Sequence, residues 1–160
     1  MSRVGHFATI LLPVDFSEHC EEAAHHAAWF ARVGGGQIHL VHVIANPLED
    51  IYETHDLLPV QVVDRAEAKA LALLEEVARR CLDPGIPYSL HVRHGDPFEK
   101  IVAVVGELGP HLIVLSTHGR GGLLHLVMGS VAEKLVRYAP CPIFVVPRKR
   151  ATKTGPESTA

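Results

Sequence analysis

The chain has 160 residues, of which 48% are hydrophobic, and its formal net charge is −3. This length favours one domain with a buried core, and this hydrophobic content argues against a globally disordered chain. The acidic balance gives no electrostatic reason to expect a nucleic-acid partner, and no apolar run approaches the ~18–20 residues that a membrane-spanning helix needs.

The hydrophobic pattern divides the chain into alternating strands and helices. The first predicted strand, 7–16, is a short apolar run that contains Pro13 and Asp15 near its end. Ser17 is placed to cap the helix that follows, whose inward face is mostly alanine and which ends at glycines 34–36. Further strands are predicted at 37–44, 87–95, 111–116 and 141–147, and further helices at 60–83, 96–108 and 131–139.

This alternation of five strands with four helices predicts an α/β fold: a doubly wound parallel sheet with helices on both faces, of the Rossmann-like type. Residues 1–147 form this single predicted domain, and the polar tail 148–160 is predicted to be disordered. Residues 1–16 lack the features of a secretory signal, and three scattered cysteines are too few for a disulfide framework. We therefore expect a cytoplasmic protein with reduced, buried or half-buried thiols.

Two strand ends carry the least ordinary residues of the sequence. In an open parallel sheet, ligands bind beyond the carboxyl ends of the strands, where the strand order reverses. Strand 7–16 delivers Asp15 to that edge, and strand 111–116 leads into the segment STHG, 116–119. If these two strands are neighbours, the two segments face each other.

Small residues after the strand 111–116 are suited to binding an anion. Gly119 and Gly129 could offer backbone N–H groups without an intervening side chain, and Ser130 begins a helix whose first N–H groups point the same way. A triphosphate fits such a cradle, and Arg120 could reach it. Readings without a ligand stay open: Ser130 could form a capping box with Glu133, Gly119 could serve a turn, and Arg120 could be a solvated loop residue.

Two further residues would complete an adenine site. Asp15 could accept a hydrogen bond from an adenine amino group or a ribose hydroxyl. Val43, at the end of strand 37–44, would give the base an apolar wall. Asp15 could also have a purely structural role, as a cap of the first helix or a brace of the loop.

Other chemistries lack their motifs. No G-x-G-x-x-G follows the first strand, and no G-x-x-x-x-G-K-[ST] occurs. The histidines are not spaced for a metal, because His39 and His42 face opposite ways on one strand, as do His91 and His94. His118 has no evident Ser–Asp partner set. We therefore predict no metal site and no catalytic residue, and any hydrolysis of a bound triphosphate should be slow.

The last strand raises a separate expectation. Its consecutive apolar residues lie between two prolines: Ile143, Phe144, Val145 and Val146. As an open edge strand it would invite aggregation, and pairing with the same strand of a second copy would cover it. This predicts a twofold homodimer, with burial under the chain's own helices as the alternative.

Taken together, these segments resemble the universal stress protein family. Its hallmark, Gly-x2-Gly-x9-Gly-[Ser/Thr] after the fourth strand, is matched from Gly119 onward, and the segments ILLPVDFSE, LVHVI, HGDPFEKI and APCPIFVV also match. The first hallmark glycine is Ser116 here, whose hydroxyl could bond a ligand oxygen but which adds bulk. The resemblance spans about 7–147 and implies strand order 3-2-1-4-5, an adenine nucleotide alpha hydrolase-like fold and a dimer formed through the last strand.

The resemblance also implies ATP as the ligand, to which we add Mg²⁺ or Mn²⁺ on the phosphates. It places Asp15 and Val43 at the adenine. It assigns the ribose and phosphates to Gly119, Gly129, Ser130 and Val131, and the base pocket to Pro13, Val14 and Leu115. We expect a dimeric, nucleotide-dependent switch of the stress response. The alternative is a dimeric interaction module of the same fold that binds no nucleotide, which Ser116 favours and the intact spacing from Gly119 to Ser130 disfavours.

Overall fold

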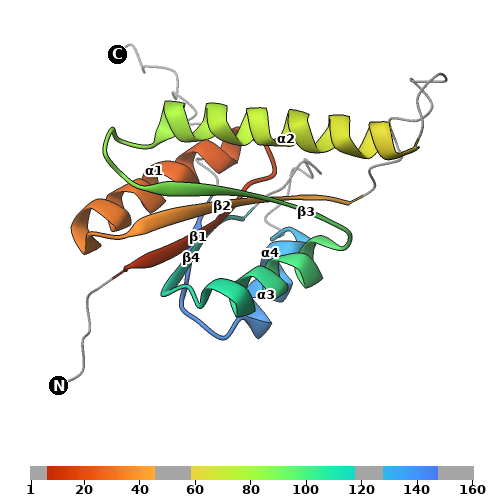
Figure 1. The fold of residues 1–160 in the computed structure, drawn as a ribbon. Helices are drawn as coiled ribbons and strands as arrows, with labels where there is room; N and C mark the ends of the chain where they lie inside the picture. Colours follow the sequence, from red (N-terminus) through yellow and green to blue (C-terminus); the bar gives the residue numbers. More distant parts are fainter. Residues whose placement is uncertain (1–6, 46–58, 118–127, 148–160) are drawn as a thin grey trace, which may run out of the picture.

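The computed structural model describes residues 7–45, 59–117 and 128–147. The strands are β1 (Thr9–Pro13), β2 (Gln37–Ile44), β3 (Tyr88–His94), β4 (Leu112–Ser116) and β5 (Ile143–Val146). The helices are α1 (Glu18–Gly34), α2 (Pro59–Cys81), α3 (Pro97–Leu108) and α4 (Ser130–Tyr138). The elements predicted from the sequence are therefore present, in the predicted chain order (Figure 1). The tail 148–160 lies outside the described residues, so its disorder stays a prediction.

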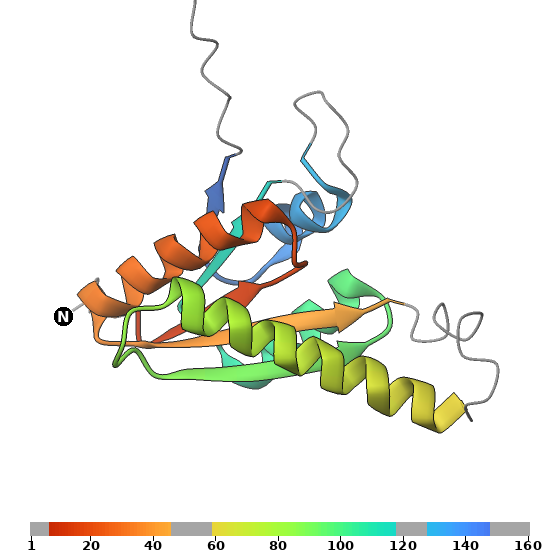
Figure 2. The same ribbon diagram turned by 90° about the horizontal axis from the view of Figure 1, so that it is seen from above.

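The five strands form one parallel sheet in the order β3-β2-β1-β4-β5. β1 lies in the middle, with β2 on one side and β4 on the other, so the strand order reverses between β1 and β4. The view from above shows α1 and α2 lying across this sheet (Figure 2). The prediction of a doubly wound sheet with this strand order is confirmed.

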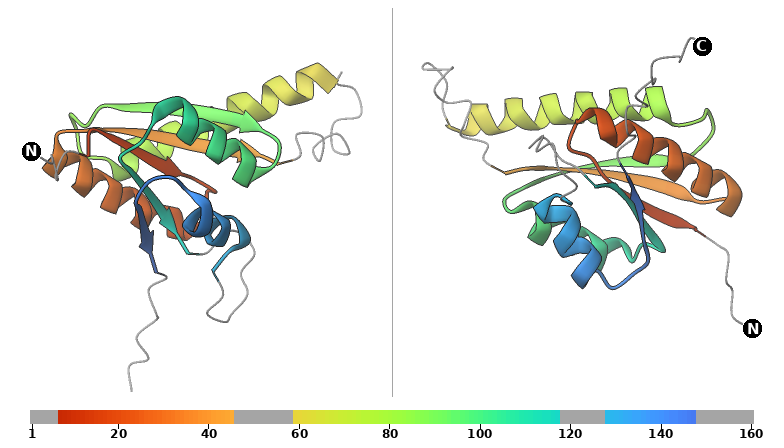
Figure 3. Two further views of the ribbon diagram at one scale, coloured as in Figure 1. Left: turned by 90° about the horizontal axis from the view of Figure 1, so that it is seen from below. Right: turned by 180° about the vertical axis from the view of Figure 1, so that it is seen from behind.

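The two faces of the sheet are covered by different helices. α1 and α2 lie over one face and α3 and α4 over the other (Figures 1 and 3). Alternation along the strands supplies both cores: Ile10 and Leu12 of β1 pack with Leu40 toward α1 and α2, whereas Leu11 packs with Val41 toward α3 and α4. Each such fully buried side chain contributes roughly 1.5–3 kcal/mol relative to its exposed state.

Helix α1 packs closely against the sheet because its buried face is small. That face consists of Cys20, Ala23, Ala24, Ala27, Ala28 and Ala31. The helix ends at Gly35, which has a left-handed φ of 64° and donates its N–H to the carbonyl of Ala31. The next residue, Gly36, lies so close to the strand that a Cβ there would be 1.8 Å from the carbonyl oxygen of Phe7.

The helix starts agree with the sequence only in part. Asp96 caps α3 as predicted, since its side chain accepts the N–H of Glu99 at 2.9 Å, and Pro97 occupies the first turn. Ser17 stands at the N-cap of α1 but makes no side-chain cap bond. Its hydroxyl instead donates to Asp15, so the expectation that Ser17 caps the helix through its side chain is wrong.

The two adjacent glycines after α1 allow a matched test of close packing. We expect Gly36→Ala to lower the free energy of unfolding by about 3 kcal/mol, because the methyl group cannot fit without moving the Phe7 carbonyl. Gly35→Ala should cost only about 1 kcal/mol, for the left-handed φ, because no atom lies within 4 Å of its added Cβ. Urea unfolding measures both, and equal losses would contradict this account.

Candidate functional site

The carboxyl ends of β1 and β4 meet at one edge of the sheet. The two strands are neighbours, with Ile10 paired to Leu112 and Leu11 to Ile113. The chain leaves β1 toward the face covered by α1 and α2, and it leaves β4 toward the face covered by α3 and α4. This is the reversal point at which parallel sheets bind ligands, as the sequence predicted.

The turn after β1 holds Asp15 by hydrogen bonds. The N–H of Val14 donates to the carbonyl of Val41 at 2.8 Å, which ties the residue before Asp15 to β2. Asp15 Oδ1 accepts two bonds from Ser17, from its N–H at 3.0 Å and from its hydroxyl at 2.7 Å. The bracing role considered for Asp15 is therefore present. Among the described residues this brace uses only Oδ1, and Oδ2 is a second acceptor on the same carboxylate.

The connection after β4 is closed by one backbone bond. The N–H of Gly129 donates to the carbonyl of Thr117 at 2.7 Å, so the chain returns to the strand end before α4 begins. The idea that the Gly129 N–H faces an anion is therefore wrong in this structure, because Thr117 already uses it. The N–H groups that have no partner within the helix are those of the first turn of α4.

Ser130 is an exposed residue at the start of α4. The N-cap is Gly129, with a φ of −59°, and Ser130 is the first residue of the helix itself. A capping box needs its serine at the N-cap, so the Ser130–Glu133 box considered as an alternative does not form. Glu133 instead accepts a bond from Arg137 at 3.3 Å. The Ser130 hydroxyl is consequently not committed to capping.

The apolar residues predicted around a base divide between the two faces. Val43, Leu115 and Val131 belong to the cluster between the sheet and α3–α4. Alternation along β1 places Pro13 on the same face. Val14 packs in the opposite cluster, toward α1 and α2, so only its backbone belongs to the edge that holds Asp15.

The remaining predicted site residues are less informative. Ser116 is half-buried at the end of β4, in register with Val146, and alternation turns it to the face opposite Leu115. Gly119 and Arg120 lie outside the described residues, and their roles stay predictions.

A family model, described as the universal stress protein family, matches residues 6–147. The chain belongs to the universal stress protein family. Universal stress protein MJ0577 of Methanocaldococcus jannaschii is 26% identical over 91% of this chain and 98% of its own. A universal stress protein of Thermus aquaticus is 32% identical over 88% of this chain and 98% of its own.

Solved structures of universal stress proteins share the fold. The structure of MJ0577 matches with a TM-score of 0.76 and 27% identity, over 91% of this chain and 99% of that one. A universal stress protein in complex with cAMP has a TM-score of 0.62 at 15% identity, over 89% and 98% of the two chains. One from Archaeoglobus fulgidus in complex with dAMP has a TM-score of 0.59 at 20% identity, over 89% and 98%.

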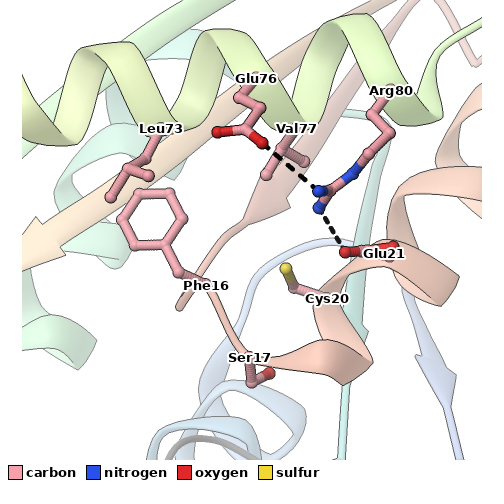
Figure 4. A pocket seen from close by; sticks show the side chains of 8 residues that line it. All are labelled: Phe16, Ser17, Cys20, Glu21, Leu73, Glu76, Val77 and Arg80. Atoms are coloured by element: carbon pink, nitrogen blue, oxygen red, sulfur yellow. Dashed lines mark hydrogen bonds and ion pairs between the residues drawn. The ribbon is translucent and has the colours of Figure 1, made fainter.

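This universal stress protein also has a small groove between the start of α1 and the middle of α2. One end of the groove is apolar and is lined by Phe16, Cys20, Leu73 and Val77 (Figure 4). At the other end, Arg80 lies between the carboxylates of Glu21 and Glu76. The guanidinium of Arg80 pairs with Glu21 of α1 and, at 3.5 Å, with Glu76 of α2. The charges at this end of the groove thus largely bind one another and tie the two helices together.

None of the three cysteines is a strong nucleophile. Burial, followed by the charges of Asp15 and Glu21, raises the pKa of the Cys20 thiol to about 12. Burial also raises the pKa of Cys81 and of Cys141. Because only the thiolate reacts, these thiols stay protonated and unreactive at neutral pH. Cys20 and Cys81 are buried and Cys141 is half-buried, as expected from the sequence.

Two histidines on neighbouring strands form a pair that the sequence did not predict, because spacing was compared only within each strand. His39 of β2 and His91 of β3 approach to 2.9 Å between Nδ1 and Nε2, on the face toward α3. His39 is only 7% exposed, and its Nε2 has no hydrogen-bond partner among the described residues. Only the register of β2 against β3, in which Val41 pairs with His91, brings the two rings together.

The described ranges contain no group of three or more metal-ligating side chains. In these same ranges, no helix is long and apolar enough to cross a bilayer.

The histidine pair makes stability depend on pH. Burial lowers the pKa of His39 from its usual value of 6.5. The pKa of His91 is also lowered, by burial first and then by the nearby His39 and Arg93, while the charge of Glu107 acts in the opposite direction. The unfolded chain therefore binds protons more readily than the folded one, and stability is lost as pH falls through about 6.5 and below. We expect the urea midpoint to fall between pH 7.5 and pH 5.

A matched pair of variants checks the cause of this pH dependence. His91→Gln keeps a polar partner for His39 but cannot titrate, so it should reduce the fall in midpoint. His25→Gln, on the exposed side of α1, serves as the control and should leave the fall unchanged. Equal behaviour of the two variants would mean that the pair is not responsible.

Proposed function

We propose that this protein binds ATP at the edge formed by β1 and β4 and acts in the cytoplasm as a nucleotide-dependent switch in the stress response. The observation that carries the proposal is the meeting of Asp15 and the first turn of α4 at neighbouring strand ends. The three free cysteines suit a reducing compartment. The arrangement offers a hydrogen-bond acceptor on one side and a positive helix end on the other.

The acceptor side suits adenine. Asp15 Oδ2 would accept the exocyclic amino group, while Oδ1 stays bonded to Ser17. Val43, Leu115 and Val131 supply an apolar wall from one cluster. A flat aromatic base against aliphatic side chains, with one polar group fixing its orientation, is the common design of such sites.

The helix side suits phosphates. The N–H groups of the first turn of α4 point out of the amino end of the helix and carry its positive partial charge. The exposed Ser130 is the first residue of this turn. A divalent cation, Mg²⁺ or Mn²⁺, would be held by phosphate oxygens and water rather than by a cluster of side chains. We propose that ATP is hydrolysed only slowly, because the sequence has no Walker lysine motif and no residue that we can assign as a general base.

Known members of the family support the ligand class. Two solved universal stress proteins of this fold carry an adenine nucleotide, cAMP in one and dAMP in the other. Their sequence identities to this chain, 15% and 20%, are low, so they support the fold's capacity for such a ligand. The residues of this chain carry the rest of the argument.

Asp15→Asn is the sharpest variant for the adenine side. The amide oxygen can still accept both bonds from Ser17, but the amide nitrogen replaces Oδ2 and would meet the adenine amino group donor to donor. We expect ATP affinity to fall about ten- to hundredfold in calorimetric titration. The urea midpoint should stay close to that of the unmodified protein, and an unchanged affinity would remove Asp15 from the site.

Gly129→Val tests the phosphate side. The φ of Gly129 is −59°, so valine causes no backbone strain there, and lost binding would reflect blocked access to the first turn of α4. We expect ATP affinity to fall by at least about tenfold.

The unmodified protein allows a direct test for bound nucleotide. The purified protein is denatured and the supernatant is separated by ion exchange, and released nucleotide would show that the protein carries it.

We further propose a homodimer formed through β5. This strand is an edge of the sheet, and three of its residues, Ile143, Phe144 and Val145, are only half-buried by the chain itself. Val146 is buried, so complete cover by the chain itself, the alternative to a dimer, is found at that residue only. Within β5, the ring of Phe144 lies 5.0 Å from the ring of Phe30 of α1, measured between centroids.

Val145→Pro tests the dimer selectively. In a parallel sheet alternate residues bond to opposite sides, and Pro142 and Val146 bond to β4. Val145 therefore directs its N–H to the open edge, and proline removes that donor without breaking the β4 ladder. We expect light scattering to show a dimer for the unmodified protein and a monomer for the variant, with unchanged circular dichroism. A monomer in both cases would contradict the proposal.

The second candidate function is a dimeric interaction module that binds no nucleotide. The departure at Ser116 favours it, together with the 49% exposure of Trp29, whose ring lies 5.1 Å from that of Phe30. An exposed tryptophan next to a phenylalanine that packs on the edge strand is suited to a protein contact. Absence of any adenine-nucleotide binding, with the dimer intact, would favour this candidate.

A further inference from the structure

His42 of β2 contacts the residues on both sides of Asp15. Its Nδ1 lies 2.7 Å from the carbonyl oxygen of Val14. A carbonyl oxygen only accepts, so Nδ1 carries the proton and donates. The other backbone group of Val14, its N–H, is bonded to the carbonyl of Val41, so the residue that precedes Asp15 is fixed to β2 at two points.

The residue after Asp15 is held by the ring of the same histidine. Phe16 has a φ of 60°, and among the described residues it is the only non-glycine with a positive φ. A bulky side chain in that conformation is unfavourable and persists only where its surroundings hold it. The Phe16 ring lies 4.3 Å from the His42 ring, tilted by 37°, and its other neighbours include Leu73 in the α1–α2 groove (Figure 4).

We infer that His42 is a positioning residue for Asp15: one imidazole fixes the carbonyl before it by a hydrogen bond and the strained residue after it by ring contact. With both neighbours fixed, the Asp15 carboxylate is kept in the orientation that bonds Oδ1 to Ser17. This inference rests on the proposed function for its consequence in binding, although the contacts themselves do not require a ligand.

Substitutions of His42 separate the two contacts. His42→Ala removes both and should weaken ATP binding about tenfold. His42→Asn retains a donor near the position of Nδ1 and should recover part of that loss, whereas His42→Phe retains only the ring contact. A residue that merely fills the core would give the opposite order, with phenylalanine the better replacement.

His39→Ala is the matched control. His39 lies on the same strand, three residues earlier, but faces the other helices, away from Phe16. It should lower stability without weakening ATP binding. Equal loss of affinity in His39→Ala and His42→Ala would mean general damage to β2, and would overturn the inference, as would unchanged affinity in His42→Ala when the unmodified protein binds ATP.

Amide hydrogen exchange tests the inference without nucleotide. In the ligand-free protein, the Ser17 N–H is protected by Asp15, and the Glu99 N–H is protected in the same way by Asp96 of α3. His42→Ala should speed Ser17 exchange about tenfold and leave Glu99 unchanged. Unchanged Ser17 exchange overturns the inference whatever the ligand. Faster Ser17 exchange in a protein that binds no nucleotide would uphold the positioning role and refute the proposed function.

Discussion

The hydrogen-bonded pairing of β1 with β4 is the constraint on which the arrangement depends. β1 is buried throughout its centre, with Ile10, Leu11 and Leu12 fully inaccessible, because strands flank it and helices cover both its faces. Its register against β4 brings two connections to one edge, although they are about a hundred residues apart in the chain. Since one connection turns to each face, Asp15 and the first turn of α4 stand on opposite sides of the edge instead of lying in one row.

This opposition gives the edge a polarity. A carboxylate stands on the β1 side, and the amino end of a helix, with its positive partial charge, on the β4 side. A ligand that matches both must donate hydrogen bonds at one end and be anionic at the other. Free phosphate is too small to reach from one side to the other and a bare base lacks the charge, whereas an adenine nucleotide carries an amino donor at one end and phosphates at the other.

The helices, the strands and their order could be predicted from the sequence, because they depend on local patterns. Periodicity located the strands and helices, the alanine face of α1 indicated a tight contact with the sheet, and Asp96 indicated the start of α3. The errors concern contacts that depend on neighbours in space. The pairing of His39 with His91 follows from strand register, and Ser17 bonds to Asp15 because of the backbone turn at Phe16. Side-chain spacing along one strand holds no information about either.

The bond between the Thr117 carbonyl and the Gly129 N–H has a consequence for how such proteins diversify. It brings the chain back to the end of β4 before α4 starts, so the sheet and the helix receive the same two anchor points whatever insertion joins them. The intervening stretch can therefore vary in length and chemistry without a change in the framework. Exchanging it between relatives, as a cassette grafted between these two anchors, should leave the core untouched.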